Sequence, residues 1–267
     1  MKIEDRILEF EPNVHTALWG HEEWLVSRHP SAMGIVKGGK FAGMKLEELA
    51  PGFNLLVKII DAKTRLSVQV HPNETTRLVT GGDPKTEMWC ALAGGEVYAG
   101  LKAGVGPADI ENAVKDGSFE KLMVRHTLKK GDAIFIPGGL VHAISDNTLV
   151  YEVQQSSDTT FRLYDWGRVG ADGKPRQLHV AQALKAIDYN LAEPRIVRDV
   201  KCAFFDFHQI DVAGGYTVSG KGWSLVYVLE GEIKIGGKSF AQGSSMLVLE
   251  GDDFVVSSTG AKILLTK

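Results

Sequence analysis

Residues 131–142 read Gly-Asp-Ala-Ile-Phe-Ile-Pro-Gly-Gly-Leu-Val-His, and this stretch says more about the fold than any other part of the chain. The β-branched and aromatic residues at 133–136 have the composition of a β-strand. The Pro-Gly-Gly at 137–139 is typical of a tight turn. His142 then opens a second apolar run. We therefore expect a strand, a sharp turn and a second strand that directs an imidazole inward.

The spacing of these residues resembles the second conserved motif of cupins, small β-barrels that hold a metal ion in their mouth. Gly131, Pro137, Gly139 and His142 all fall at the positions of that motif. One position departs from it, because the Asn expected four residues after the His is Asp146. The resemblance implies a double-stranded β-helix, or jelly roll, with His142 in a metal site.

Short β-like runs recur along the rest of the chain. Examples are residues 148–153 and 224–228, and turn signals such as the Gly-Gly-Asp-Pro of residues 81–84 separate them. This pattern predicts an all-β protein. We expect two helices to interrupt it, at residues 107–122 and 178–187, where apolar residues recur near helical spacing.

The C-terminal part predicts a second, smaller barrel. A break near residues 191–194 precedes it, so the expected domains are residues 1–190 and 191–267. Residues 243–249 have the spacing of the second cupin motif, but its Pro and His are missing. The expected fold is therefore all-β, with two cupin-like barrels in tandem and a few inserted helices. The first barrel would carry the metal and the catalytic residues, and the second would have no metal site.

Composition limits the partners and the compartment. A net charge of −3, a pI of about 6.3 and the lack of a Lys/Arg cluster argue against a nucleic-acid-binding surface. No apolar stretch is long enough to span a membrane, and residues 1–13 contain no apolar signal core. Cys90 and Cys202 do not make a disulfide framework. We expect a cytoplasmic monomer or weak homodimer without nucleic-acid or membrane partners.

A set of possible metal ligands comes from three segments. Alternation along a predicted strand places Ser67, Gln69 and His71 on one face, with apolar residues on the other. Glu87 opens a later apolar strand, at a spacing that resembles the latter half of the first cupin motif. With His142, these residues offer two imidazoles, one carboxylate and one amide oxygen. Such a set suits Zn²⁺, and Fe²⁺, Mn²⁺ or Co²⁺ less selectively.

Several longer segments together resemble the type I mannose-6-phosphate isomerase family, in its short bacterial form. Their order and spacing match the family over most of residues 15–190, whereas the C-terminal part matches only in general. The matching segments are residues 56–62, 66–72, 85–89, 131–142, 151–168 and 178–184.

The resemblance implies both a metal and a reaction. Members of the family bind one Zn²⁺ through a Gln, two His and a Glu, which match Gln69, His71, Glu87 and His142 here. The implied reaction is the reversible conversion of mannose 6-phosphate to fructose 6-phosphate through an enediol. The expected partner is therefore a small sugar phosphate.

Further residues gain candidate roles from the same resemblance. Lys85, Asp158 and Arg162 match positions that have been proposed to handle substrate and transfer protons. Ser67 and Arg168 match positions near the phosphate. A dianionic phosphate favours Arg forks and Lys point charges, and Arg162 is the best candidate to position it or to stabilise the enediolate.

Two candidates complete the set. Glu152 lies on the polar face of a predicted strand, where it could orient His142 or act as a base. Many family members begin with a Trp-Gly-Gly segment near the substrate. Trp19 is therefore a substrate-binding candidate, although His21 takes the place of the second Gly.

Alternatives stay open at this point. The base could be Lys85, Asp158 or Glu152, and Arg162 could instead form a salt bridge with Asp158 or Asp165. The protein could be another cupin enzyme such as an iron dioxygenase, but the Gln ligand and the basic residues argue against that. It could also be an isomerase of another sugar phosphate, or a sugar-phosphate-binding cupin without catalysis.

Overall fold

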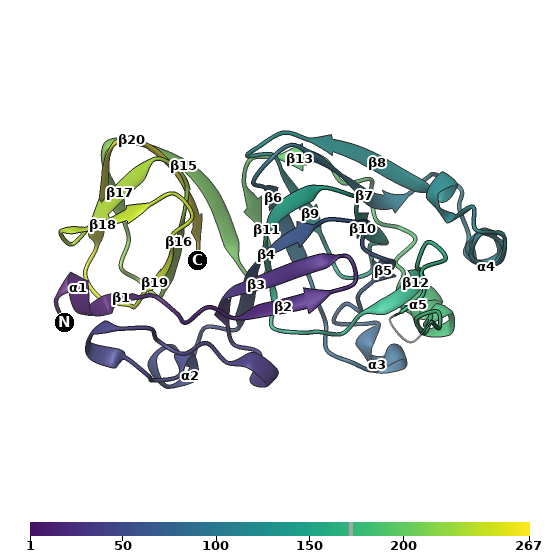
Figure 1. Cartoon of the computed structure of the whole chain (residues 1–267), viewed down its shortest axis with the longest axis horizontal. Coiled ribbons are helices and arrows are strands. Elements are labelled where there is room, and N and C mark those ends of the chain that lie inside the picture. Colours follow the sequence, from purple (N-terminus) through teal and green to yellow (C-terminus); the bar gives the residue numbers. More distant parts are fainter. Residues whose placement is uncertain (171–172) are drawn as a thin grey trace. The chain divides into compact units, whose positions relative to one another are not determined.

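The computed structural model describes residues 1–170 and 173–267, whose contacts group the chain into two compact units. Unit 1 comprises Met1–Asn13, Trp24–Leu56 and Arg198–Lys267, and unit 2 comprises Val14–Glu23 and Val57–Val197. Both units consist mainly of curled β-sheet, which confirms the expected all-β class (Figure 1). The domain boundary expected after residue 190 stays a prediction, and the contacts place residues 1–13 and 24–56 with the C-terminal strands.

Unit 1 is built around one eight-stranded sheet. Six of its strands follow the order β1-β19-β16-β20-β15-β14, and of the other two, β17 pairs with β20 and β18 pairs with β17. Its core consists of alternate side chains of these strands, including Val226, Val228, Ile263 and Leu265. The elements of this unit are α1 (Ile3–Arg6), β1 (Ile7–Leu8), η1 (Pro30–Ala32), η2 (Gly39–Phe41), α2 (Leu46–Leu49), β14 (Val200–Lys201), β15 (Asp206–Val218), β16 (Ser224–Glu230), β17 (Glu232–Ile235), β18 (Lys238–Ala241), β19 (Ser245–Val248) and β20 (Phe254–Thr266).

Unit 2 contains a five-stranded sheet, β12-β5-β10-β7-β8, and a seven-stranded sheet, β13-β9-β6-β11-β4-β3-β2. The chain passes between the units within β3 (Gly20–Ser27) and β4 (Leu55–Ala62). The other elements are β2 (Val14–Ala17), β5 (Val68–Val70), α3 (Arg77–Thr80), β6 (Glu87–Ala91), β7 (Gly95–Leu101), α4 (Pro107–Asp116), η3 (Phe119–Leu122), β8 (Met123–Leu128), β9 (Ala133–Ile136), β10 (His142–Ile144), β11 (Thr148–Gln155), β12 (Phe161–Tyr164), α5 (Val180–Ala186) and β13 (Ile196–Val197).

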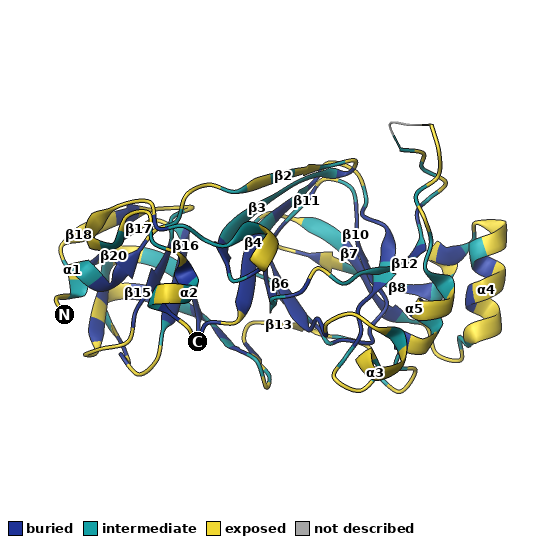
Figure 2. Ribbon diagram, turned by 90° about the horizontal axis from the view of Figure 1, so that it is seen from below, coloured by how far each residue is buried: buried dark blue, intermediate teal, exposed yellow. Residues whose placement is uncertain are grey.

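The five-stranded sheet of unit 2 is covered on both faces. On one face, Val97 and Ile144 join Trp89 and Ile134 of the seven-stranded sheet in one apolar cluster. On the other face, side chains such as Val68 and Ala143 pack against residues of α4 and α5. The helices α3, α4 and α5 therefore carry much of the exposed surface of this unit (Figure 2). Since successive strand residues point to opposite faces, the neighbours of Val68 and Ala143 turn toward the seven-stranded sheet.

Both helices expected from the sequence are present, one of them divided. The helix expected at residues 107–122 becomes α4 and η3, because Gly117 adopts a left-handed conformation with φ of 77° that ends α4. The helix expected at residues 178–187 is α5. Within residues 1–170 and 173–267, no helix combines the length and the apolar character needed to cross a membrane.

The Pro-Gly-Gly turn between β9 and β10 ties three parts of unit 2 together. Gly139 N donates to His71 O at 2.8 Å, and Gly138 N donates to Thr86 Oγ1 at 3.1 Å. A Cβ on Gly138 would lie 2.7 Å from Pro72 O, closer than real Cβ atoms approach. Glycine is therefore required at this turn by the close passage of the segment that follows His71.

Gly138→Ala should lower the free energy of unfolding by about 2 kcal/mol, because the added methyl group forces the backbone near Pro72 to move. The matched control is Gly94→Ala, where the nearest heavy atom to a new Cβ is Leu128 O at 3.8 Å. Urea unfolding should place the control within about 0.5 kcal/mol of the wild type. Equal stabilities of the two variants would contradict this account of the turn.

Candidate metal centre

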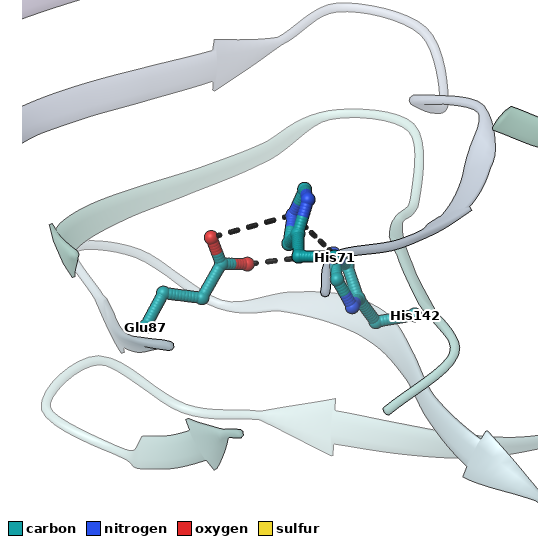
Figure 3. Close-up of side chains that lie close together, drawn as sticks. All are labelled: His71, Glu87 and His142. Carbon is teal, nitrogen blue, oxygen red and sulfur yellow. Dashed lines mark hydrogen bonds and ion pairs between the residues drawn. The ribbon is translucent and has the colours of Figure 1, made fainter. Parts of the chain in front are cut away.

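Three side chains from distant parts of unit 2 converge: His71, Glu87 and His142 (Figure 3). Their donor atoms all lie within 4.8 Å of one another. The two Nε2 atoms of the imidazoles are 3.1 Å apart. The Glu87 carboxylate approaches both rings, with Oε1 3.4 Å from His142 Nε2 and Oε2 3.6 Å from His71 Nε2. Each side chain is at most 1% exposed. These residues form a candidate metal centre.

Strand register brings these residues together. His142, the first residue of β10, is paired with Gln69 of β5, so both side chains lie on the same face of the five-stranded sheet. His71 follows directly after β5, and Glu87 opens β6 in the seven-stranded sheet. The centre therefore lies between the two sheets of unit 2.

Hydrogen bonds at the outer edges of both rings fix their tautomers. Nδ1 of His71 lies 2.7 Å from the carbonyl oxygen of Thr159, and Nδ1 of His142 lies 2.9 Å from that of Leu140. A carbonyl only accepts, so each Nδ1 is the protonated nitrogen. Each Nε2 therefore presents a lone pair to the centre, as metal-binding histidines do.

The surroundings also keep both rings neutral. Burial, followed by the nearby charge of Lys85, lowers the pKa of His71 well below its usual value. The same two causes lower the pKa of His142 to about 3. A metal ion binds imidazole in its neutral form, so both rings are already in the required state at neutral pH.

Gln69 supplies the fourth candidate ligand. Its side-chain amide lies 3.3 Å from His142 Nε2, measured from its Nε2 atom. The oxygen of this amide is a good ligand for Zn²⁺ and similar ions, and the two ends of an amide exchange by rotation about one bond. The four residues predicted from the sequence are thus adjacent in space.

The arrangement fits a divalent cation. Two Nε2 lone pairs that face each other at 3.1 Å repel unless a cation lies between them. Oε1 of Glu87 is buried and, among the described residues, has no hydrogen-bond partner. Burial, followed by the charge of Glu152, raises the pKa of Glu87 to about 7, while Lys85 opposes the rise. A buried carboxylate oxygen without a partner, beside two neutral imidazoles, is an environment that a bound metal ion would stabilise.

A line of alternating charges leads away from this centre. Lys85 Nζ donates to Glu87 Oε2 and lies 3.8 Å from Glu152 Oε1. The same Oε1 lies 3.2 Å from Lys58 Nζ, which in turn lies 3.0 Å from Glu22 Oε2. Lys58 and Glu22 were not predicted as site residues from the sequence. The sequence signal that could have indicated Lys58 is its position within the otherwise apolar run 55–60.

Lys58 is charged despite its burial. Burial alone would lower its pKa, but the charges of Glu152 and Glu22 outweigh this effect and raise the pKa above its usual value. Glu152 is also held by Trp89, whose Nε1 donates to its Oε2 at 2.8 Å. The four other charged groups on this line are therefore fixed in place before any ligand binds. They are Lys85, Glu152, Lys58 and Glu22.

A second group of predicted residues lies next to the metal ligands. Arg162 of β12 is paired with Gln69 of β5, so their side chains share one face of the sheet. Arg162 Nε donates to the buried Ser67 Oγ at 3.3 Å. Arg168 lies nearby, and its Nη2 donates to Asp165 Oδ1 at 2.6 Å. Arg162 and Ser67 thus place two groups suited to anions beside the candidate ligand Gln69.

Comparison with known proteins shows the family of the chain. No family model matches the chain. The chain is 32% identical to mannose-6-phosphate isomerase ManA of Bacillus subtilis over 261 residues, which cover 85% of this chain and 82% of that protein. The chain belongs to the mannose-6-phosphate isomerase family. It is also 35% identical to the Streptococcus mutans mannose-6-phosphate isomerase over 182 residues, and this match spans 57% of that protein.

Solved structures of the family share the fold. A mannose 6-phosphate isomerase from Bacillus subtilis superimposes with a TM-score of 0.86 at 24% identity, covering 98% of this chain and 99% of that one. The H99A mutant of the Salmonella typhimurium enzyme gives 0.74 at 14% identity, covering 98% and 99%. A mannose 6-phosphate isomerase described as bound with zinc and yttrium gives 0.72 at 14% identity, with the same coverage.

Two of the predicted residues lie apart from both groups. Trp19 is 8% exposed and packs in the apolar cluster of unit 2 with Ile60 and Leu66. Asp158 is exposed and precedes Thr159, whose carbonyl holds His71. Substrate binding by Trp19 and catalysis by Asp158 stay predictions.

Removal of one imidazole should strongly weaken metal binding. His142→Ala should weaken binding of Zn²⁺ by more than the roughly 10–100-fold that follows loss of a residue supporting a ligand. Competition with a chromophoric chelator measures this affinity. His208→Ala is the control, because His208 is 41% exposed and pairs with Asp206 in unit 1. Unchanged metal affinity in His142→Ala would show that the ion binds elsewhere.

Proposed function

We propose that this chain interconverts mannose 6-phosphate and fructose 6-phosphate with Zn²⁺ held by Gln69, His71, Glu87 and His142. The observation that carries the proposal is the juxtaposition on neighbouring strands of a neutral-imidazole metal centre and a group of anion donors. The first suits activation of a sugar carbonyl, and the second suits a phosphate ester. The family relatives, named for this isomerisation, support the same substrate.

Zinc is the metal that the donor set favours. Two neutral imidazoles, a carboxylate and an amide oxygen are intermediate between the soft thiolate sites and the all-oxygen sites of other ions. A structural relative is described as bound with zinc and yttrium, which supports the same choice. Zinc held by these four side chains supplies a Lewis acid that offsets negative charge developing on the sugar oxygens.

The proton transfers fall to residues beside the ligands. A base must take the proton from C2 of the open-chain aldose, and an acid must deliver one to C1. Lys85 and Glu152 are the best placed of the three candidates, since Lys85 Nζ lies 3.1 Å from His71 Nε2 and 3.8 Å from Glu152 Oε1. A rigidly held pair of this kind can contribute about 10²–10⁴-fold to the rate.

Arg162 and Ser67 would orient the other end of the substrate. Ser67 directly precedes β5, so it is separated from Gln69 by about 7 Å, the advance of two residues of extended chain. A sugar phosphate with its carbonyl end at the metal centre and its phosphate at Arg162 and Ser67 would be fixed in a single orientation. Such orientation converts binding energy into rate by removing rotational freedom before the reaction.

A coupled assay for fructose 6-phosphate tests the whole proposal. Purified protein should convert mannose 6-phosphate, lose activity with a chelator, and regain it when Zn²⁺ is added back. Heat-treated protein with the same Zn²⁺ controls for conversion by the free metal. No product from zinc-loaded, folded protein would refute the proposed reaction and leave binding without turnover, or another sugar phosphate, as the function.

Arg162→Ala should separate substrate orientation from metal binding. We expect kcat/KM to fall by about 100-fold while zinc content stays unchanged, since the guanidinium donates to Ser67 and Gln177 and to none of the metal ligands. Arg125→Ala is the control, because Arg125 is 57% exposed and pairs with Glu96 on β7. A near-normal kcat/KM in Arg162→Ala would place the phosphate elsewhere.

A further inference from the structure

A buried carboxylate lies among three guanidinium groups beside the proposed substrate site. The group consists of Arg162, Arg168, Arg176 and Asp165, and is called the guanidinium cluster below. Asp165 follows directly after β12 and is 5% exposed. The sequence alone indicates no role for Arg176, and for Asp165 only a possible salt bridge with Arg162.

Asp165 holds two of the three arginines. Arg176 binds it as a fork, with Nε 2.7 Å from Oδ2 and Nη2 2.5 Å from Oδ1. Arg168 Nη2 shares the same Oδ1 at 2.6 Å. Burial alone would raise the pKa of Asp165, but these hydrogen bonds from Arg176 and Arg168 outweigh it and lower the pKa. Asp165 is therefore ionised and fixes the planes of both guanidinium groups.

The positive charges of the cluster exceed the negative charge. Arg162 is bound by neutral acceptors, Ser67 Oγ and the Gln177 carbonyl. Burial, followed by the charges of Arg176 and Arg168, lowers its pKa, and Asp165 compensates only in part. Three guanidinium groups around one carboxylate leave a formal excess of two positive charges, which matches a phosphate dianion.

One hydrogen-bond donor of the cluster has no acceptor among the described residues. Arg168 Nη1 donates to Arg65 O at 2.6 Å, but in the described part of the chain Arg168 Nε is buried and has no hydrogen-bond partner. A buried charged donor without a partner is costly. A phosphate oxygen is the type of acceptor that would satisfy it, and the excess charge favours the same ligand.

We infer that Asp165 and Arg176 are positioning residues for the sugar phosphate. Together they orient Arg168, and Arg176 provides the second excess positive charge, which selects a dianion. Asp165 holds Arg168 in the orientation observed. Arg176 keeps the carboxyl group of Asp165 ionised and offsets its negative charge. Without Arg176, Asp165 would draw Arg168 away from the ligand and cancel more of the charge offered to it. This inference rests on the proposed sugar-phosphate substrate and adds two residues to its recognition.

Inorganic phosphate tests the inference without any turnover. Calorimetric titration of the zinc-loaded full chain should show phosphate binding that weakens by about tenfold or more in Arg176→Met and Asp165→Asn. In the isomerase assay, the same variants should raise KM by a similar factor while kcat changes little. Arg176→Lys should recover part of the affinity, because it keeps the charge and loses the fork.

Arg198→Met is the matched control. Arg198 forms the same type of pair, with Asp211 at 2.6 Å, but is 54% exposed in unit 1. It should bind phosphate as the wild type does. Wild-type phosphate affinity in Arg176→Met, or no phosphate binding by the wild type, would overturn the inference. If Asp165→Asn does not fold, Arg176→Met decides the question. Phosphate binding that depends on Arg176 in a protein without isomerase activity would refute the proposed reaction alone.

Discussion

The Glu87 carboxylate has no access to solvent, and most of the site follows from the need to compensate its charge. An isolated buried carboxylate is too costly to persist in ionised form. Lys85 and the imidazoles of His71 and His142 lie around Glu87, and Lys85 is itself near the buried Glu152. Each charge along the line to Glu22 thus has an opposite charge next to it. Breaking such a buried pair by removal of one member typically costs about 3–5 kcal/mol.

Three of the four candidate ligands are strand residues rather than loop residues. Gln69, His142 and Glu87 all lie on paired strands, so backbone hydrogen bonds fix the spacing of their side chains. Sites built on regular elements hold their geometry more precisely than sites built on loops. The loop ligand, His71, is held instead by Thr159 and by the turn at Gly139.

Local sequence was sufficient to predict the fold class and to name the four candidate ligands that the structure brings together. The turn at Gly138 and the strand start at His142 belong to one continuous motif, so spacing along the chain reveals both. Lys58 and Arg176 could not be found in this way. Their partners, Glu152 and Asp165, become neighbours through strand register and loop path, which a single sequence does not encode locally. The division of α4 from η3 at Gly117 was missed because apolar spacing continued across the glycine.

Unit 1 is assembled from segments far apart in the sequence, and this has a consequence for synthesis of the protein. Arg6 donates to the carbonyl of Leu249, 243 residues later, and β1 pairs with β19. At the usual rate of translation, roughly 5–20 residues per second, β1 waits on the order of ten to fifty seconds for its partner strand. The segments of unit 2, in contrast, have all been synthesised by residue 197. Unit 2, which carries the candidate metal ligands, can thus assemble on the ribosome, while β1 remains without its partner strand and accessible to chaperones.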